Sequence, residues 1–174
     1  MLVNLSDVLT SQGKTESIIT ELGLQTYECK LGSFPIIHKE PVSITATNTG
    51  NGKAHIEVTT SLVLMMNCDR CLKDVAKNFD LSFSRQVHAP STDAEEDPDE
   101  LSFMEGYQLD VENLISREIL TNWPMKVLCK EDCKGICTKC GKDLNTGECN
   151  CDTFIPDPRM AVIKDIFNAN NKEV

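Results

Sequence analysis

The sequence lacks an apolar run of roughly 18 residues, which is the length a membrane-spanning helix needs. Its opening residues, MLVNLSDVLT, lack the basic and then apolar stretches of a signal peptide, and residues 1–25 lack the arginines of a transit peptide. The chain also contains no internal repeat and no catalytic motif. We therefore expect a cytoplasmic protein that is not an enzyme.

The chain also lacks the basic balance of a typical nucleic-acid-binding protein, since its net charge is −10. The acidity is local, however. Residues 91–124 carry 1 basic and 10 acidic side chains, so they supply −9 of this charge. The segment 91–100 holds five acids between Glu95 and Glu100 and reads as an exposed acidic loop. It is either a solvated linker or a docking site for a basic partner.

Cysteine, in contrast, is abundant, with nine residues. Cys29 stands alone, Cys68 and Cys71 form a C-D-R-C motif, and the other six lie between Cys129 and Cys151. In a reducing compartment, paired cysteines indicate metal ligands or redox groups rather than structural disulfides. Metal binding is the interpretation that the clustering favours.

The spacing predicts two four-thiolate zinc sites. C137-T-K-C140 and C149-N-C151 are joined by a turn-prone segment and form one small ribbon. The remaining pairs form a second site: Cys68, Cys71, Cys129 and Cys133. The alternative is a single site drawn from the six C-terminal cysteines, so one or two zinc ions per chain are expected. Sulfur ligands also admit iron or an iron–sulfur cluster. All three histidines lie outside the cluster, so the sites look closed and structural.

Four lysines alternate with these cysteines: Lys130, Lys134, Lys139 and Lys142. One interpretation is that they offset the formal −2 charge of a zinc ion with four thiolates. The other is that they contact RNA phosphates.

The remaining pattern predicts an α+β fold. Alternating residues from about 26 to 90 predict an antiparallel sheet, with a hairpin turn at 48–53 and C68-D-R-C71 at the tip between two strands. Residues 110–123 predict a helix capped by Asp110 that packs on the sheet.

Two short helical or irregular pieces are predicted near the N-terminus, at Leu5–Leu9 and Ile18–Leu22, and Asp157 begins a predicted final helix. We expect a core domain, 1–124, and a cysteine-rich segment, 125–174, clamped to it by zinc.

The order of these motifs resembles the YceD family, also called the large ribosomal RNA subunit accumulation proteins. The resemblance covers roughly residues 1–170 and is specific from Cys68 onward; Trp123 departs from the Leu or Ala usual before the proline. It implies a small non-enzymatic protein, described as metal-binding, that is linked to accumulation or processing of large-subunit ribosomal RNA. Some members lack the last four cysteines, which implies that Cys68, Cys71, Cys129 and Cys133 form the core set.

Together these features predict a ribosome-assembly factor whose partner is ribosomal RNA or the pre-ribosomal large subunit. One alternative is an adaptor whose acidic loop binds a ribosomal protein. A second is a thiol redox protein that uses Cys68 and Cys71, which would need a reactive thiolate without bound metal.

Overall fold

A computed structural model of the chain describes residues 1–90 and 103–151. The predicted acidic loop at 91–100 and the predicted final helix from Asp157 lie outside these residues. The chain forms two compact units. The first combines Met1–Cys68 with Lys73–Cys129, and the second combines Asp69–Leu72 with Lys130–Val174, the latter described up to residue 151.

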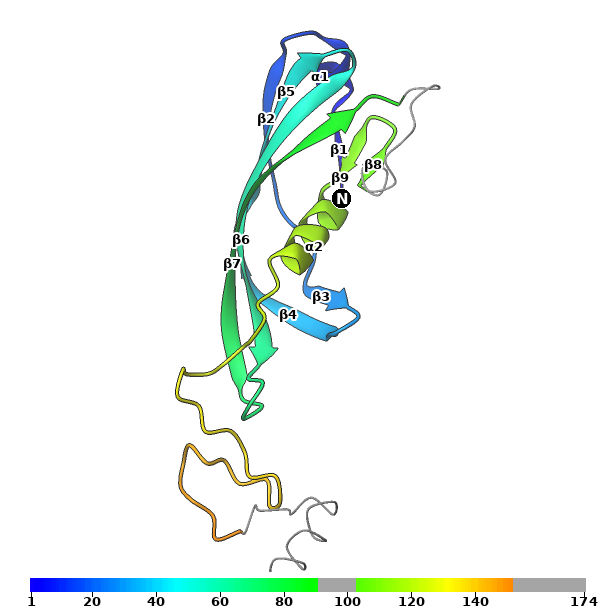
Figure 1. Ribbon diagram of the computed structural model, residues 1–174. Coiled ribbons are helices and arrows are strands. Elements are labelled where there is room, and N and C mark those ends of the chain that lie inside the picture. The colour runs from blue at the N-terminus through cyan, green and yellow to red at the C-terminus, as the bar shows by residue number, and fades with distance from the viewer. Residues whose placement is uncertain (91–102, 152–174) are drawn as a thin grey trace, which may run out of the picture. The chain divides into compact units, whose positions relative to one another are not determined.

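The described elements are nine strands and two helices (Figure 1). The strands are β1 (Leu2–Asn4), β2 (Thr15–Thr20), β3 (Thr26–Cys29), β4 (Gly32–Lys39), β5 (Val42–Gly50), β6 (Lys53–Asn67), β7 (Asp74–His88), β8 (Met104–Glu105) and β9 (Gln108–Asp110). The helices are α1 (Ser6–Thr10) and α2 (Val111–Thr121).

The first unit is organised around the long strand β6. Strand β7 pairs antiparallel with β6 along its whole length, from Lys53↔His88 to Asn67↔Asp74. On the other edge of β6, β5 pairs with its first half and β4 with its second half. The larger sheet has the order β2-β5-β6-β4-β3, with β7 on β6, and β1, β9 and β8 form a small sheet.

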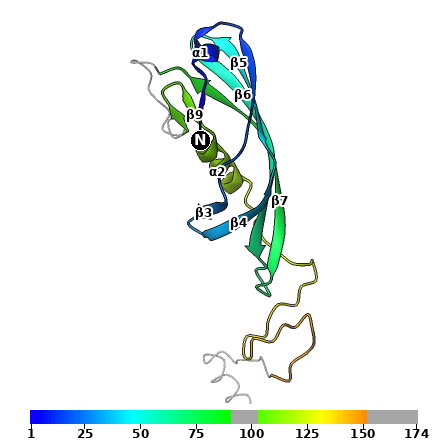
Figure 2. The same cartoon turned by 180° about the vertical axis from the view of Figure 1, so that it is seen from behind.

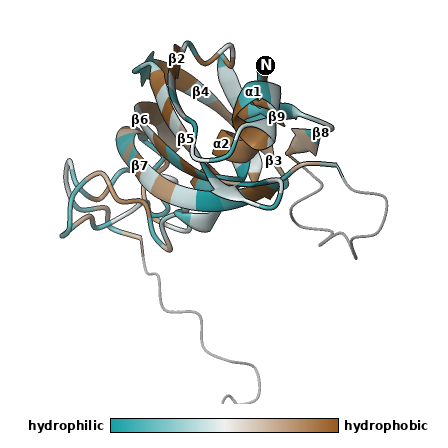
Figure 3. Ribbon diagram, turned by 90° about the horizontal axis from the view of Figure 1, so that it is seen from above, coloured by the Kyte–Doolittle hydropathy of each residue, from teal (hydrophilic) through white to brown (hydrophobic). Residues whose placement is uncertain are grey.

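The alternation of side chains along β6 explains how the sheet makes a core. Every second residue from Ala54 to Met66 turns inward, and Ile56, Val58 and Leu62 are fully buried. Helix α2 lies on the concave side of the curved sheet in both opposite views (Figures 1 and 2). Figure 3 shows the strands banded by hydropathy. The predicted α+β class, an antiparallel sheet with a packed helix, is confirmed.

Helix α2 matches its prediction closely. The Asp110 carboxylate accepts hydrogen bonds from the backbone amides of Glu112 and Asn113, which satisfies donors that have no partner within the helix. The side chains of Val111, Leu114, Ile115 and Ile119 are buried. These residues hold the helix against the sheet.

An aromatic cluster holds the chain just after α2. The Trp123 ring meets Phe34 edge-on at 4.9 Å between centroids, and lies 5.8 Å from Tyr27 and 6.0 Å from Phe79. The Tyr27 hydroxyl donates to the carbonyl of Ser116 at 3.2 Å. The path that leads toward Cys129 therefore begins from an anchored position.

The helical expectation for Ile18–Leu22 is wrong. Residues 15–20 form β2, in which Ile18 pairs with Ile44 of β5 and Ile19 points to solvent. Its Thr-Glu-Ser-Ile-Ile-Thr sequence carries β-branched residues, and pairing with β5 decides its conformation. The first piece does form a helix, α1, with Val8 and Leu9 buried. Among the described residues, no helix combines the length and apolarity needed to cross a membrane.

Candidate metal centre

The turn that joins β6 to β7 presents the first cysteine pair. The Cys68 amide donates to the Lys73 carbonyl at 2.8 Å, which closes the turn directly after the last strand pair. Leu72 takes a positive φ of 61°, which reverses the chain. Cys68 and Cys71 are both buried. The prediction that C-D-R-C sits at a strand tip is confirmed.

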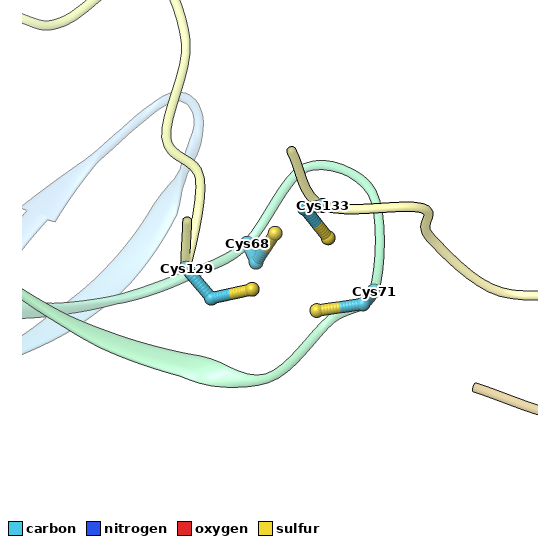
Figure 4. A group of neighbouring side chains, drawn as sticks. All are labelled: Cys68, Cys71, Cys129 and Cys133. Atoms are coloured by element: carbon cyan, nitrogen blue, oxygen red, sulfur yellow. The ribbon is translucent and has the colours of Figure 1, made fainter. Parts of the chain in front are cut away.

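The second pair of the first group comes from the segment that follows α2. Cys133 is buried and Cys129 is exposed. The four sulfur atoms, those of Cys68, Cys71, Cys129 and Cys133, all lie within 4.8 Å of one another and point toward a common centre (Figure 4). A tetrahedral zinc ion with bonds of about 2.3 Å places its sulfurs about 3.8 Å apart. The four thiols therefore fit one zinc ion after small side-chain movements.

Residues 69–72 and 130–136 are tied together by hydrogen bonds within the second unit. The Arg70 guanidinium donates to the Cys133 carbonyl at 2.6 Å, and the Ile136 amide donates to the Arg70 carbonyl at 3.2 Å. Gly135 has φ +79°, and a Cβ there would lie 3.0 Å from the Arg70 carbonyl oxygen. Only glycine fits this position without movement of the backbone.

The second cysteine group lies wholly within the second unit. The sulfurs of Cys137, Cys140, Cys149 and Cys151 also lie within 4.8 Å of one another. The Gly141 amide donates to the Cys137 carbonyl at 2.9 Å, and Gly141 has φ +71°. A tight turn thus brings two sulfurs to one edge of the group, as a tetrahedral zinc site requires.

Two thiols of this group have opposite pKa shifts. The backbone amides of Cys140 and Lys139 donate to the Cys137 sulfur and lower its pKa to about 6. The Cys151 thiol donates to the Cys140 sulfur, and this bond together with burial raises the pKa of Cys151 to about 12. The hydrogen bonds that lower the pKa of Cys137 favour its thiolate, which is the form that binds a metal ion.

Both groups consist of cysteine alone. Such sets suit closed structural zinc sites, whereas catalytic zinc sites keep one coordination position open. The structure thus brings together the same two sets of four cysteines that the spacing predicts, which leaves Cys29 outside both. That these sets hold zinc stays a prediction.

The chain matches the model of a known protein family. Residues 56–167 match the family model described as large ribosomal RNA subunit accumulation protein YceD, which covers more than half of the chain. The chain belongs to the YceD family. The match includes all eight clustered cysteines, and the YceD description refers to accumulation of the large ribosomal RNA subunit. No curated protein and no solved structure matches the chain.

The four lysines of this YceD member are all exposed, in two different situations. Lys130 pairs with Asp132 at 3.6 Å, and the Lys142 ammonium donates to the Glu148 carbonyl at 2.8 Å. Both contacts are local, as expected for lysines that solvate a turn. Lys134 and Lys139 are the better candidates for contact with an external phosphate.

The sequence pattern did not single out three residues that support the cysteines: Arg70, Gly135 and Asn145. The position of Arg70 inside C68-D-R-C71 was a signal that could have found it. Asn145 belongs to D143-L-N145, and side chains of this kind often bond to nearby backbone. Its contact with Cys133, across 12 positions, has no sequence signature.

Proposed function

We propose that this protein is a non-enzymatic zinc-binding factor that supports accumulation or processing of large-subunit ribosomal RNA by binding the pre-ribosomal large subunit. The observation that carries the proposal is the pair of four-cysteine groups within a chain of the YceD family. Zinc is the metal of choice because closed sets of four thiolates are typical of its structural sites.

In this proposal the first zinc ion has an architectural role. Its ligands, Cys68 and Cys71 on one side and Cys129 and Cys133 on the other, are far apart in the sequence. An ion bound by all four would tie a hairpin turn to the segment that follows α2. It would thereby clamp residues 125–174, the cysteine-rich segment, to residues 1–124, the core domain. The free energy of zinc binding would then contribute directly to folding.

The proposed contact with RNA runs through the exposed lysines of the cysteine segment. Substitution of Lys134 and Lys139 gives the sharpest test, because Lys130 and Lys142 have local partners. Binding of the zinc-loaded protein to isolated large-subunit RNA should weaken in a Lys134→Ala/Lys139→Ala variant. The slope of log affinity against log salt should fall by roughly 1 for each lysine–phosphate ion pair that the variant can no longer form.

The matched control is Lys30→Ala/Lys77→Ala, which removes the same charge from exposed positions of the first unit. It should bind RNA like the wild type. Equal weakening of RNA binding in both variants would mean that binding depends on net charge and not on Lys134 and Lys139. Absence of RNA binding, with binding to a ribosomal protein that disappears on deletion of residues 91–100, would support the adaptor instead. Rapid alkylation of Cys68 in the zinc-loaded protein would support the redox alternative.

A further inference from the structure

A hydrogen bond connects the loop of the second cysteine group to a cysteine of the first. Asn145 lies in the loop 141–148, between Cys140 and Cys149 of the second group. Its amide nitrogen lies 3.4 Å from the sulfur of Cys133, which belongs to the first group. All of these residues belong to the second unit. A side chain held between ligands of one group therefore touches a ligand of the other.

The orientation of the Asn145 amide is fixed by its other partners. Its oxygen accepts the backbone N–H of Lys134 at 2.9 Å, so this oxygen cannot be the atom that faces the sulfur. Its nitrogen also donates to an Asp143 carboxylate oxygen at 2.7 Å, and its backbone N–H donates to the same oxygen at 2.8 Å. The NH₂ group is thus the donor available to Cys133, and an N–H donor stabilises a thiolate.

The loop that carries Asn145 is fastened to the segment between the two groups. The Leu144 amide donates to the Gly135 carbonyl at 2.9 Å, and Ile136 forms a β-bridge with Asp143. At its two ends the loop reaches Cys140 and Cys149, so a metal ion in the second group would close it. A closed loop has fewer conformations, which favours the one that places Asn145 on Cys133.

We propose that Asn145 is a positioning residue that couples the two metal groups: an ion in the second group fixes loop 141–148, and Asn145 then stabilises the Cys133 thiolate for an ion in the first. The inference rests on the proposed zinc binding. Loss of an outer partner of this kind lowers metal affinity by about 10–100-fold. Because coupling between two binding sites is reciprocal, an ion in the first group also favours binding in the second.

The first test is Asn145→Ala in the full chain, loaded with cadmium and observed by cadmium NMR. Each four-sulfur group gives its own resonance, and a Cys68→Ser/Cys71→Ser variant assigns the one from the first group. Asn145→Ala should shift the first-group resonance, because it removes a hydrogen bond to the Cys133 sulfur. It should lower first-group zinc affinity about tenfold, within the range for outer partners. Asn150→Ala, an exposed asparagine of the same segment, is the matched control and should change neither.

The second test is a double-mutant cycle that separates coupling from a local effect. Cys149→Ser/Cys151→Ser, which disables the second group, should itself lower the zinc affinity of the first. In that background, adding Asn145→Ala should have little further effect, because the loop is no longer closed. Two bound ions with unchanged first-group affinity in Asn145→Ala would overturn this inference alone. Failure of the wild-type first group to bind any metal would overturn the proposed zinc site and this inference with it.

Discussion

Replacement of Gly135 by alanine tests the contact between residues 69–72 and 130–136. An alanine at φ +79° is in a left-handed conformation that costs an L-residue about 1–2 kcal/mol. Its Cβ would also lie 3.0 Å from the Arg70 carbonyl oxygen, which is backbone and cannot turn aside. Relief of this contact requires residues 70 and 135 to move apart, and each lies next to or near a cysteine of the first group, Cys71 and Cys133 respectively.

A destabilisation of about 1–2 kcal/mol corresponds to a factor of about 5–30 in an equilibrium constant. We therefore expect the zinc affinity of the first group to fall at least about tenfold, since the free-energy cost of the close contact with Arg70 adds to that of the backbone strain. Affinity is measured by competition against a chromophoric chelator. The Cys68→Ser/Cys71→Ser variant identifies the part of the signal that belongs to the first group.

The matched control is Gly106→Ala, in the turn between β8 and β9. Gly106 also has a positive φ, +63°, but its added Cβ would meet no atom within 4 Å. The same left-handed strain should destabilise the first unit by about 1–2 kcal/mol and leave zinc affinity unchanged. Equal zinc affinities for Gly135→Ala and the wild type, or an equal loss in Gly106→Ala, would refute the reasoning.

Three further predictions concern the core, the helix cap and a thiol. Ile115→Ala should lower the free energy of unfolding by about 2–5 kcal/mol, while the exposed Leu120→Ala should change it by less than about 0.5 kcal/mol, as urea titration followed by Trp123 fluorescence would show. Asp110→Ala should cost about 1 kcal/mol in the same assay, and no change would exclude its role as helix cap. In metal-free protein, thiolate absorbance should show a step near pH 6 that Cys137→Ser removes. Because that pKa is lowered on folding, the stabilisation by the Cys137 thiolate is lost as pH falls through about 6.

Local patterns predicted much of the first unit. The turn at 48–53 was found because Gly50, Asn51 and Gly52 supply the positive φ angles that the hairpin needs. Helix α2 was found because its cap and apolar stripe lie within one short segment. The sharing of one β6 edge by β4 and β5 could not be predicted, since it depends on pairing between distant segments. The same reason explains the missed strand β2.

For the cysteine groups too, local spacing was informative and long-range contacts were not. The spacing favoured these two sets of four but left a single C-terminal site open, because it does not fix which distant pairs share an ion. The contacts that support them were not predictable. Arg70 meets Cys133 across 63 positions and Asn145 meets it across 12, so both contacts exist only once the chain has folded.

The most direct test of the central claim is the zinc content of the protein, measured by elemental mass spectrometry after purification without chelator. The two cysteine groups predict two zinc ions per chain, falling to one in the Cys68→Ser/Cys71→Ser variant. One ion that is unchanged in the variant would confine the metal to the second group and contradict the proposed clamp. No bound zinc in the wild type would contradict both sites.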